Sequence, residues 1–241
     1  FNSYWFITAG EREQYPTLRG TVLPNIPAFP RATPSFSSSG STILMVGSLA
    51  YPPNRVGFER FYRNCWPTIQ RAAPAATLRI VGWMSSDQQA QLQTDPRVQA
   101  PGFVDDLDAE YARAALVVAP VYSGGGTSIK ILEAAAHGRA CVTTRFRLKG
   151  LEPDFNGHSD IVATATDDEM AAVCIRLLGD PDERERLARS AYAVIGAKYT
   201  HAAFRSTIIE DVSAALRQAG KADLAAAVDT ITTAARAQSA P

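Results

Sequence analysis

The residues from Ser123 to Gly138 combine a glycine-rich segment, the expected start of a helix and one acidic residue. Three consecutive glycines, Gly124–Gly126, follow an apolar run and let the backbone approach a ligand closely. The first N–H groups of the next helix have no partner within the helix, and the helix dipole favours an anion there. The segment therefore predicts a site for a phosphate-bearing ligand.

Glu133 lies about one and a half turns inside the same expected helix. A phosphate repels a carboxylate beside it, so Glu133 is better suited to accept hydrogen bonds from hydroxyl groups such as those of a ribose. Two plainer interpretations remain open. The glycine-rich loop could be a tight connection that binds no ligand, and Glu133 could be a solvated residue on the helix surface. Three successive glycines cost stability, which favours the ligand site.

The glycines do not fit either common glycine motif. A Walker loop needs Gly-Lys-Ser/Thr after four spacer residues, and the dinucleotide fingerprint needs a glycine where Ile129 stands, in the first βα turn. Here the glycines follow the fourth expected strand. Ligands in open α/β sheets bind at the carboxyl ends of strands, so the loop is well placed for a ligand, whatever that ligand is.

From Ser41 onward, short apolar runs alternate with helical patterns, which is typical of βαβ units. We therefore predict an α/β fold with an open, doubly wound parallel sheet, Rossmann-like, followed by C-terminal helices. One amphipathic helix is marked by apolar residues at three- and four-residue intervals, from Phe58 to Ile69. The expected strands are 42–46, 77–81, 97–101, 116–119, 140–144 and 160–163.

The pattern divides the chain into three segments. Residues 1–40 are rich in proline and serine, as linkers are, and residues 41–200 carry the alternating strands and helices. Residues 201–241 are helical by pattern, and beyond Gly220 they form either a marginal helix or a frayed tail. The chain begins with Phe1 and no signal peptide, so we expect a piece of a longer protein.

Composition excludes several classes of partner. The 24 basic residues balance 24 acidic ones without a basic block, which disfavours nucleic acid, and no apolar stretch is long enough for a transmembrane helix. The three cysteines have no metal-ligand spacing and are interpreted as buried, reduced thiols, which fits the cytoplasm. Asp105, Asp106 and Asp108 suit a helix N-terminus better than a metal, and His137 suits a helix C-terminus.

Several motifs in order resemble the retaining glycosyltransferases of the GT-B fold, family 4, also called glycosyl transferases group 1. The resemblance covers roughly residues 21–200 and rests on the nucleotide-sugar-binding, C-terminal domain of that family. Its motifs are Val46-Gly47-Ser48 with Pro53-Asn54, Trp66-Pro67, Ile80-Val81-Gly82, Gly102-Phe103-Val104, Lys130-Ile131-Leu132-Glu133-Ala134 and Lys149-Gly150-Leu151-Glu152.

The resemblance implies roles for the residues of the glycine segment. Glu133 corresponds to the second Glu of the family's Glu-x7-Glu pattern and would hold the ribose hydroxyls. The first Glu is replaced by Gly125, so a carboxylate that contacts the sugar in other members is absent. The backbone after Gly124, at Gly126, Thr127 and Ser128, would cradle the diphosphate or the sugar.

Other positions of the donor site follow from the same resemblance. Gly47 and Ser48 would approach the phosphates, and the backbone at Phe103 and Val104 would border the nucleobase. Lys130 or Arg55 would be the cation that stabilises the leaving diphosphate, so neither a metal nor another cofactor is expected.

The implied activity is transfer of a sugar from a nucleoside diphosphate sugar to a saccharide or lipid-linked acceptor, as in polysaccharide biosynthesis. Residues 6–13 and 21–25 resemble the last helix and interdomain strand of the acceptor-binding half, most of which is missing. This piece alone would then bind the donor without turnover, and any peripheral membrane contact would pass through the missing half. The alternatives are an inactive nucleotide-binding or scaffolding domain and, less favoured, an unrelated nucleotide-binding enzyme such as a sugar-nucleotide epimerase.

Overall fold

The computed structural model describes residues 4–38, 40–125 and 127–238, and the side chains of these up to residue 230. The chain forms two compact units. The larger one spans residues 27–195, and the smaller one combines residues from 1–26 with residues from 196–241. The whole glycine-rich segment, from Ser123 to Gly138, lies within the larger unit.

The larger unit contains a six-stranded parallel sheet with the strand order β5-β4-β3-β6-β7-β8. This is the doubly wound order, and it confirms the predicted fold class. Three predicted strands have the observed bounds, and the other three differ by one or two residues at their ends. The strands are β3 (Thr42–Val46), β4 (Thr77–Val81), β5 (Val98–Gly102), β6 (Leu116–Ala119), β7 (Cys141–Thr144) and β8 (Val162–Thr164).

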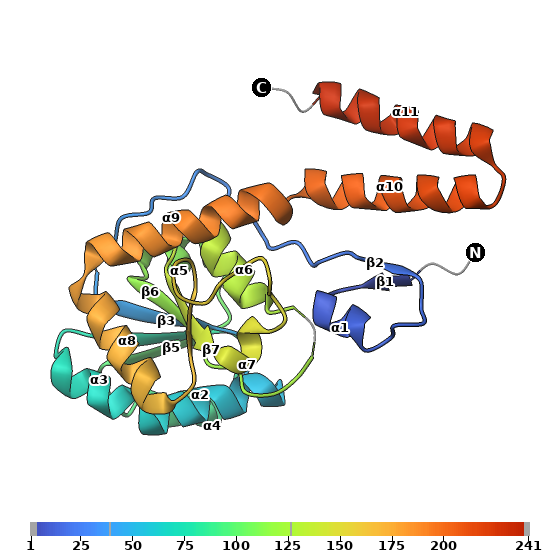
Figure 1. Ribbon diagram of the computed structural model, residues 1–241. Helices are drawn as coiled ribbons and strands as arrows, with labels where there is room; N and C mark the ends of the chain where they lie inside the picture. The colour runs from blue at the N-terminus through green and yellow to red at the C-terminus, as the bar shows by residue number, and fades with distance from the viewer. Residues whose placement is uncertain (1–3, 39, 126, 239–241) are drawn as a thin grey trace. The chain divides into compact units, whose positions relative to one another are not determined.

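Helices cover both faces of this sheet (Figure 1). The core on one face contains Phe61, Trp66 and Ile69, so the apolar face predicted after β3 is buried. The single helix predicted from Phe58 to Ile69 is instead two helices that meet at Cys65, because Pro67 favours the first turn of a new helix. Strands β6 and β7 are buried along their whole length, as strands covered on both faces must be. The helices are α2 (Pro52–Asn64), α3 (Trp66–Ala72), α4 (Ser86–Leu92), α5 (Leu107–Arg113), α6 (Ile129–Ala136), α7 (Arg145–Leu148), α8 (Asp167–Gly179) and α9 (Pro181–Lys198), the last reaching the boundary between the units.

Gly57 allows helix α2 to lie directly against the end of strand β6. A Cβ atom at this position would overlap the carbonyl oxygen of Pro120, which is backbone and has little freedom to move. A helix-interior glycine ordinarily costs stability, so its presence here reflects this close approach. The approach brings the first turn of α2, including Asn54, to the carboxyl ends of the central strands.

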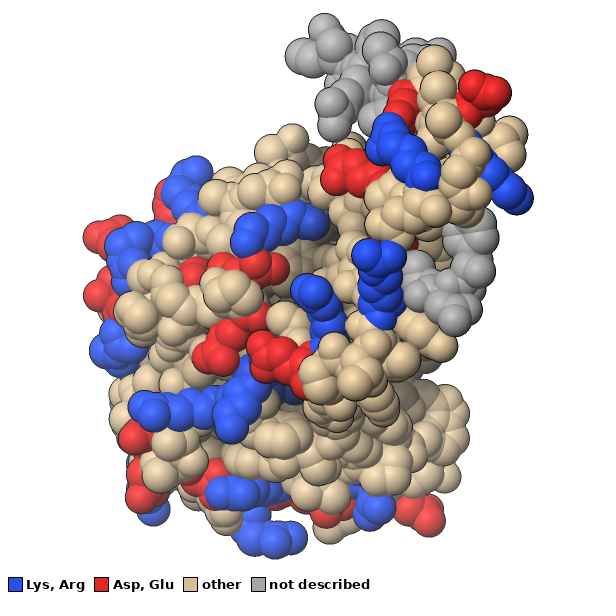
Figure 2. Space-filling model, turned by 45° about the vertical axis from the view of Figure 1, so that its right-hand side comes forward, with Lys and Arg blue, Asp and Glu red and all other residues tan. Residues whose placement is uncertain are grey.

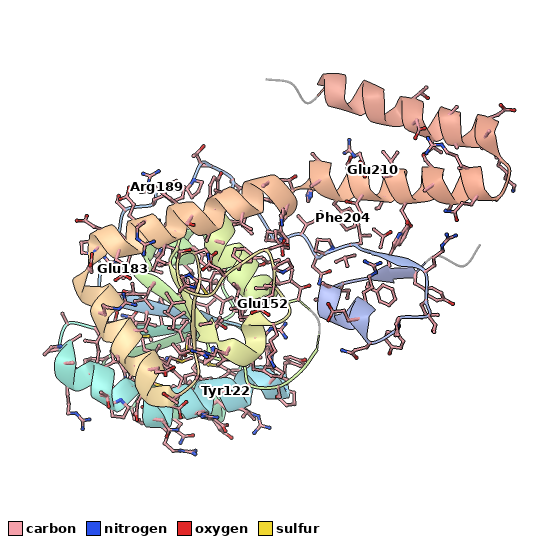
Figure 3. All side chains as sticks on the ribbon, viewed as in Figure 1. Tyr122, Glu152, Glu183, Arg189, Phe204 and Glu210 are labelled. Carbon is pink, nitrogen blue, oxygen red and sulfur yellow. The ribbon has the colours of Figure 1, made fainter. Side chains whose placement is uncertain are left out.

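Two buried arginines fix the proline- and serine-rich segment before β3. Arg139 donates to the carbonyl oxygens of Ser35 and Ala114, and Arg184 donates to the carbonyl oxygen of Ser38 at 2.6 Å. Arg189, labelled on α9 in Figure 3, lies 4.4 Å from the centre of a phenylalanine ring in the same segment. This segment, residues 27–38, has a composition typical of linkers but is ordered, because its backbone carbonyl oxygens accept hydrogen bonds from buried guanidinium groups. We call it the strap.

The smaller unit joins the two ends of the chain. Asp211 accepts hydrogen bonds from Trp5 Nε1 at 2.8 Å and from Thr21 Oγ1 at 2.6 Å, so one carboxylate connects three elements. The predicted linker at residues 1–40 thus contains a parallel pair of strands, and the segment after Gly220 forms a helix. The elements are β1 (Tyr4–Phe6), α1 (Ala9–Glu13), β2 (Gly20–Val22), α10 (His201–Gln218) and α11 (Ala222–Gln238).

Candidate functional site

A cleft of about 330 Å³ opens at the carboxyl ends of β3 and β6. The order of the sheet reverses between these two strands, which is the place where open α/β sheets bind ligands. The cleft brings together six of the residues predicted for the site. It is lined by Val46, Gly47, Tyr51, Asn54, Val121, Ser123, Gly125, Thr127, Ser128, Ile129, Lys130, Glu133 and Arg147.

Gly47 ends strand β3 with a positive φ of 149°. A Cβ atom there would lie 2.7 Å from Asn54 Nδ2, so a side chain would displace this amide, and it would touch Lys130 Cε at 3.5 Å. Gly82 ends β4 in a similar conformation and packs against the backbone of Gly47. Both positions need glycine, for the conformation and for the space.

Lys130 lies in the first turn of α6 and points to the loop after β3. Its Nζ donates to Asn54 Oδ1 at 2.6 Å, and Asn54 Nδ2 donates to the carbonyl oxygen of Ser48 at 3.0 Å. Burial, and after it the nearby charge of Arg147, lower the pKa of Lys130 to about 8. The amide is a neutral partner, so this lysine carries a charge that an anion would stabilise.

Arg147 is a second cation in the cleft, supplied by the one-turn helix after β7. Its side chain is 9% exposed, and its Nη1 lies 3.4 Å from the carbonyl oxygen of Gly125. Burial lowers the pKa of this guanidinium as well. The motifs in the sequence do not indicate Arg147. The one sequence signal for this residue is its position just after β7, the strand next to β6.

Glu133 lies one turn further along α6 and is held by two other segments. Tyr111 donates its hydroxyl to Glu133 Oε2 at 3.3 Å, and the backbone at Ala28 also forms a hydrogen bond with the carboxylate. Burial raises the pKa of Glu133. The carboxylate is thus fixed in position and lines the cleft with free acceptor capacity for hydroxyl groups.

Asp106, Asp108 and His137 stabilise the elements that carry Tyr111 and Glu133. Asp106 caps α5 by accepting from the backbone N–H of Ala109 at 3.1 Å, as the sequence predicted. Asp108 accepts from His137 Nε2 at 3.0 Å, and the His137 ring stacks on Tyr111 with 4.2 Å between the ring centres. Within the described residues, no group of three or more His, Cys, Asp or Glu side chains has the arrangement of a metal site.

The remaining predicted residues lie around the cleft or away from it. Arg55 forms an exposed ion pair with Glu59 at 3.8 Å and lines a different groove on α2, so the structure does not bring it to the cleft. Phe103 is 78% exposed and follows β5 together with Val104. Gly124 has a φ of 96° beside the Tyr51 hydroxyl, and Gly126 lies outside the described residues.

Three further predictions concern the cysteines, the charge and the membrane. Cys65, Cys141 and Cys174 are buried and unpaired, as predicted. Figure 2 shows basic and acidic side chains interspersed over one face of the molecule, in keeping with the balanced charge. Across the residues that the structure describes, no helix has the length and apolarity to cross a bilayer.

A doubly wound sheet with a cleft at its switch point defines a Rossmann-like domain. Residues 40–180 match the family model of the glycosyl transferases group 1, which is more than half of the 241 residues. The chain therefore belongs to this family. A search of curated proteins finds no significant match.

Solved structures show the same fold at low sequence identity. A mutant of TarM from S. aureus, in complex with fondaparinux, alpha-GlcNAc-glycerol and UDP, has a TM-score of 0.74 at 14% identity, over 87% of this chain and 43% of that one. Sucrose-phosphate synthase from Thermosynechococcus elongatus has a TM-score of 0.66 at 17% identity, over 88% of this chain and 59% of that one.

A third structure corresponds to an isolated domain. The C-terminal domain of the group 1 glycosyl transferase LpcC from Francisella tularensis has a TM-score of 0.54 at 15% identity, over 69% of this chain and 89% of that domain. In contrast, this chain spans less than two thirds of the length of the TarM and sucrose-phosphate synthase chains. Its fold is that of the Rossmann-like domain of GT-B glycosyltransferases.

Proposed function

We propose that this chain is mainly the donor-binding half of a retaining GT-B glycosyltransferase of family 4. It would serve transfer of a sugar from a nucleoside diphosphate sugar to a saccharide or lipid-linked acceptor. The observation that carries the proposal is the placement of a partly buried carboxylate, Glu133, and a partly buried cation, Lys130, on adjoining turns of α6 in one cleft. The family match and the UDP held by TarM support it.

The two groups suit the two ends of a nucleotide. Hydroxyl groups of a ribose donate to a carboxylate, so Glu133 would hold the ribose, while Lys130 would contact the phosphates. Gly47 and the backbone at Thr127 and Ser128 would allow the diphosphate to come close to the protein. The backbone at Phe103 and Val104 would border the nucleobase.

In the proposed reaction, the bond between the anomeric carbon and the β-phosphate oxygen breaks. A new bond forms between that carbon and the acceptor hydroxyl oxygen, the nucleoside diphosphate departs with the bonding electrons, and the hydroxyl proton is released to solvent. Fixed positive charge close to the departing oxygen lowers the barrier. Lys130 would supply such charge, so we propose a reaction without a metal or another cofactor.

The rest of the proposal concerns the context of this half. A separate acceptor-binding domain would complete the active site, so this chain alone would bind the donor without turning it over. We place the protein in the cytoplasm, with any membrane contact made peripherally through the other domain. Gly125 favours one alternative, an inactive nucleotide-binding or scaffolding domain, because it removes a carboxylate that other members direct at the sugar.

Calorimetric titration of the 241-residue chain with UDP, GDP, ADP and dTDP tests the nucleotide site. At least one of these nucleotides is expected to bind. Glu133→Ala should weaken the binding of that nucleotide about tenfold, which is the loss expected when a charged hydrogen-bond acceptor is removed. The same variant should lose the preference for the ribonucleotide over its 2′-deoxy form. Glu152→Ala, at an exposed position labelled in Figure 3, is the control.

Two results would count against the proposal. If a folded chain binds none of the four nucleotides, the donor site does not exist. If Glu133→Ala binds as tightly as the unaltered chain, Glu133 is not at the ribose. Turnover assays with the complete protein then separate the enzyme from the inactive alternative, because only the enzyme would consume the sugar donor.

A further inference from the structure

Two buried polar atoms in the cleft have no hydrogen-bond partner. Among the side chains that the structure describes, four have a buried nitrogen or oxygen atom in this state, and two of the four, Ser128 Oγ and Arg147 Nε, belong to residues of the cleft. Both are hydrogen-bond donors. Native structures rarely leave such groups unpaired, and a ligand is one common explanation.

The charge of Arg147 is also poorly compensated. The side chain is nine-tenths buried, and its hydrogen bond goes to the neutral carbonyl oxygen of Gly125 at 3.4 Å. Lys130 is bonded in the same way to a neutral amide oxygen, and the charges of Lys130 and Arg147 are close enough to repel each other. The Glu133 carboxylate offsets part of this repulsion at Lys130, and an anion bound between the two cations would offset more of it.

We infer that Arg147 binds the β-phosphate of the donor nucleotide, together with Lys130 and the Ser128 hydroxyl. The assignment rests on the proposed function and adds a residue that neither the motifs nor the family resemblance indicated. A planar guanidinium donates to one phosphate through two N–H groups in a fixed fork, whereas a lysine acts as a point charge. Arg147 thereby acts on the group that leaves with the nucleotide.

The layout of the cleft favours the β-phosphate over the α-phosphate. Lys130 feels the charges of both Glu133 and Arg147, and it lies one turn before Glu133 on α6. Arg147 comes from a different element, α7, and reaches the loop at Gly125. A nucleotide with its ribose at Glu133 would pass Lys130 first, and its second phosphate would reach Arg147.

Matched variants of one short helix test the inference. Arg147→Gln and Arg145→Gln remove the same charge from α7, but Arg145 is exposed and does not line the cleft. Each variant is titrated, with EDTA present, with the nucleoside diphosphate that the unaltered chain binds and with its monophosphate. We expect Arg147→Gln to lose about tenfold or more for the diphosphate and less than about threefold for the monophosphate, and Arg145→Gln to lose neither.

Arg147→Met and thermal melting separate ligand binding from a structural role. Because the free guanidinium is buried without compensation, the methionine variant should melt at the same temperature as the unaltered chain or above it, yet bind the diphosphate about tenfold or more weakly. A lower melting temperature with unchanged affinity would assign Arg147 to the scaffold and overturn the inference. Equal losses for monophosphate and diphosphate would also overturn it.

Inorganic pyrophosphate distinguishes failure of this inference from failure of the proposed function. If the chain binds pyrophosphate through Arg147 but binds no nucleotide, the anion site stands and the proposed function falls. If nucleotides bind and Arg147→Gln leaves their affinity unchanged, the proposed function stands and the inference falls. If neither pyrophosphate nor any nucleotide binds the folded chain, both are wrong.

Discussion

Lys130 Nζ lies 2.6 Å from Asn54 Oδ1, and this contact joins α6 to α2 across the carboxyl ends of β3 and β6. Asn54 also donates to the carbonyl oxygen of Ser48 at 3.0 Å, so one neutral amide positions both the lysine and the loop after β3. Because the amide orients the ammonium group without neutralising it, the positive charge of Lys130 is retained for a ligand.

Asn54→Asp is expected to weaken the binding of nucleoside diphosphates about tenfold at pH 7, because the new carboxylate would pair with Lys130 and repel the phosphates. Calorimetric titration measures the change. Asn25→Asp, at an exposed position, adds the same charge elsewhere and should leave the affinity unaltered. Equal affinities for Asn54→Asp and the unaltered chain would show that Lys130 does not face the phosphates.

The affinity for a nucleoside diphosphate is expected to fall as the pH rises through about 8. Lys130 has a lowered pKa of about 8, so it loses its proton and its attraction for phosphate above that pH. The phosphate itself is already fully ionised, since its last proton leaves at about pH 6. The slope should approach a tenfold loss per pH unit while the free lysine titrates and the bound one does not.

Titrations between pH 7 and 9.5 check this dependence. Lys130→Met should bind more weakly at pH 7 and show a flatter profile. Lys149→Met, which removes an exposed lysine at the end of α7, should keep the profile of the unaltered chain. A profile that stays flat in the unaltered chain would remove Lys130 from the binding site.

Gly57→Ala is expected to destabilise the fold by about 2 kcal/mol or more, because its methyl group would overlap the carbonyl oxygen of Pro120 and push α2 away from the sheet. Gly196→Ala is the comparison change, in the last turn of α9 with nothing within 4 Å of the added Cβ, and it should stabilise by up to about 0.5–1 kcal/mol. Chemical denaturation measures both. A neutral Gly57→Ala would mean that α2 tolerates displacement.

Tyr111→Phe is expected to raise the pKa of Glu133 further, since the hydroxyl donates to the ionised carboxylate. Nucleotide affinity should fall by about two- to fivefold, the effect of one modest hydrogen bond, with a larger loss at pH 6 than at pH 8. Tyr62→Phe, outside the cleft, is the control. A loss that does not depend on pH would point to a displaced helix in place of an altered carboxylate.

Much of the larger unit was predictable because its signals are local. The strands at 42–46, 77–81 and 116–119 are short apolar runs between helical patterns, and parallel sheets buried on both faces require such runs. Lys130 and Glu133 could be grouped in advance because the helical repeat places them on adjoining turns after the glycines. In contrast, Arg55 was a poor candidate because its sequence position does not reveal which way its side chain points.

What the sequence by itself determined, therefore, was the family, the doubly wound fold and the part of the cleft carried by α6. The tertiary structure alone decided which distant groups complete it: Asn54 from α2, Tyr111 from α5, Arg147 from α7 and the backbone of Ala28 from the strap. Sequence patterns report on burial and on neighbours along one element. Contacts between elements depend on packing distances, such as the close approach at Gly57, that no local pattern encodes.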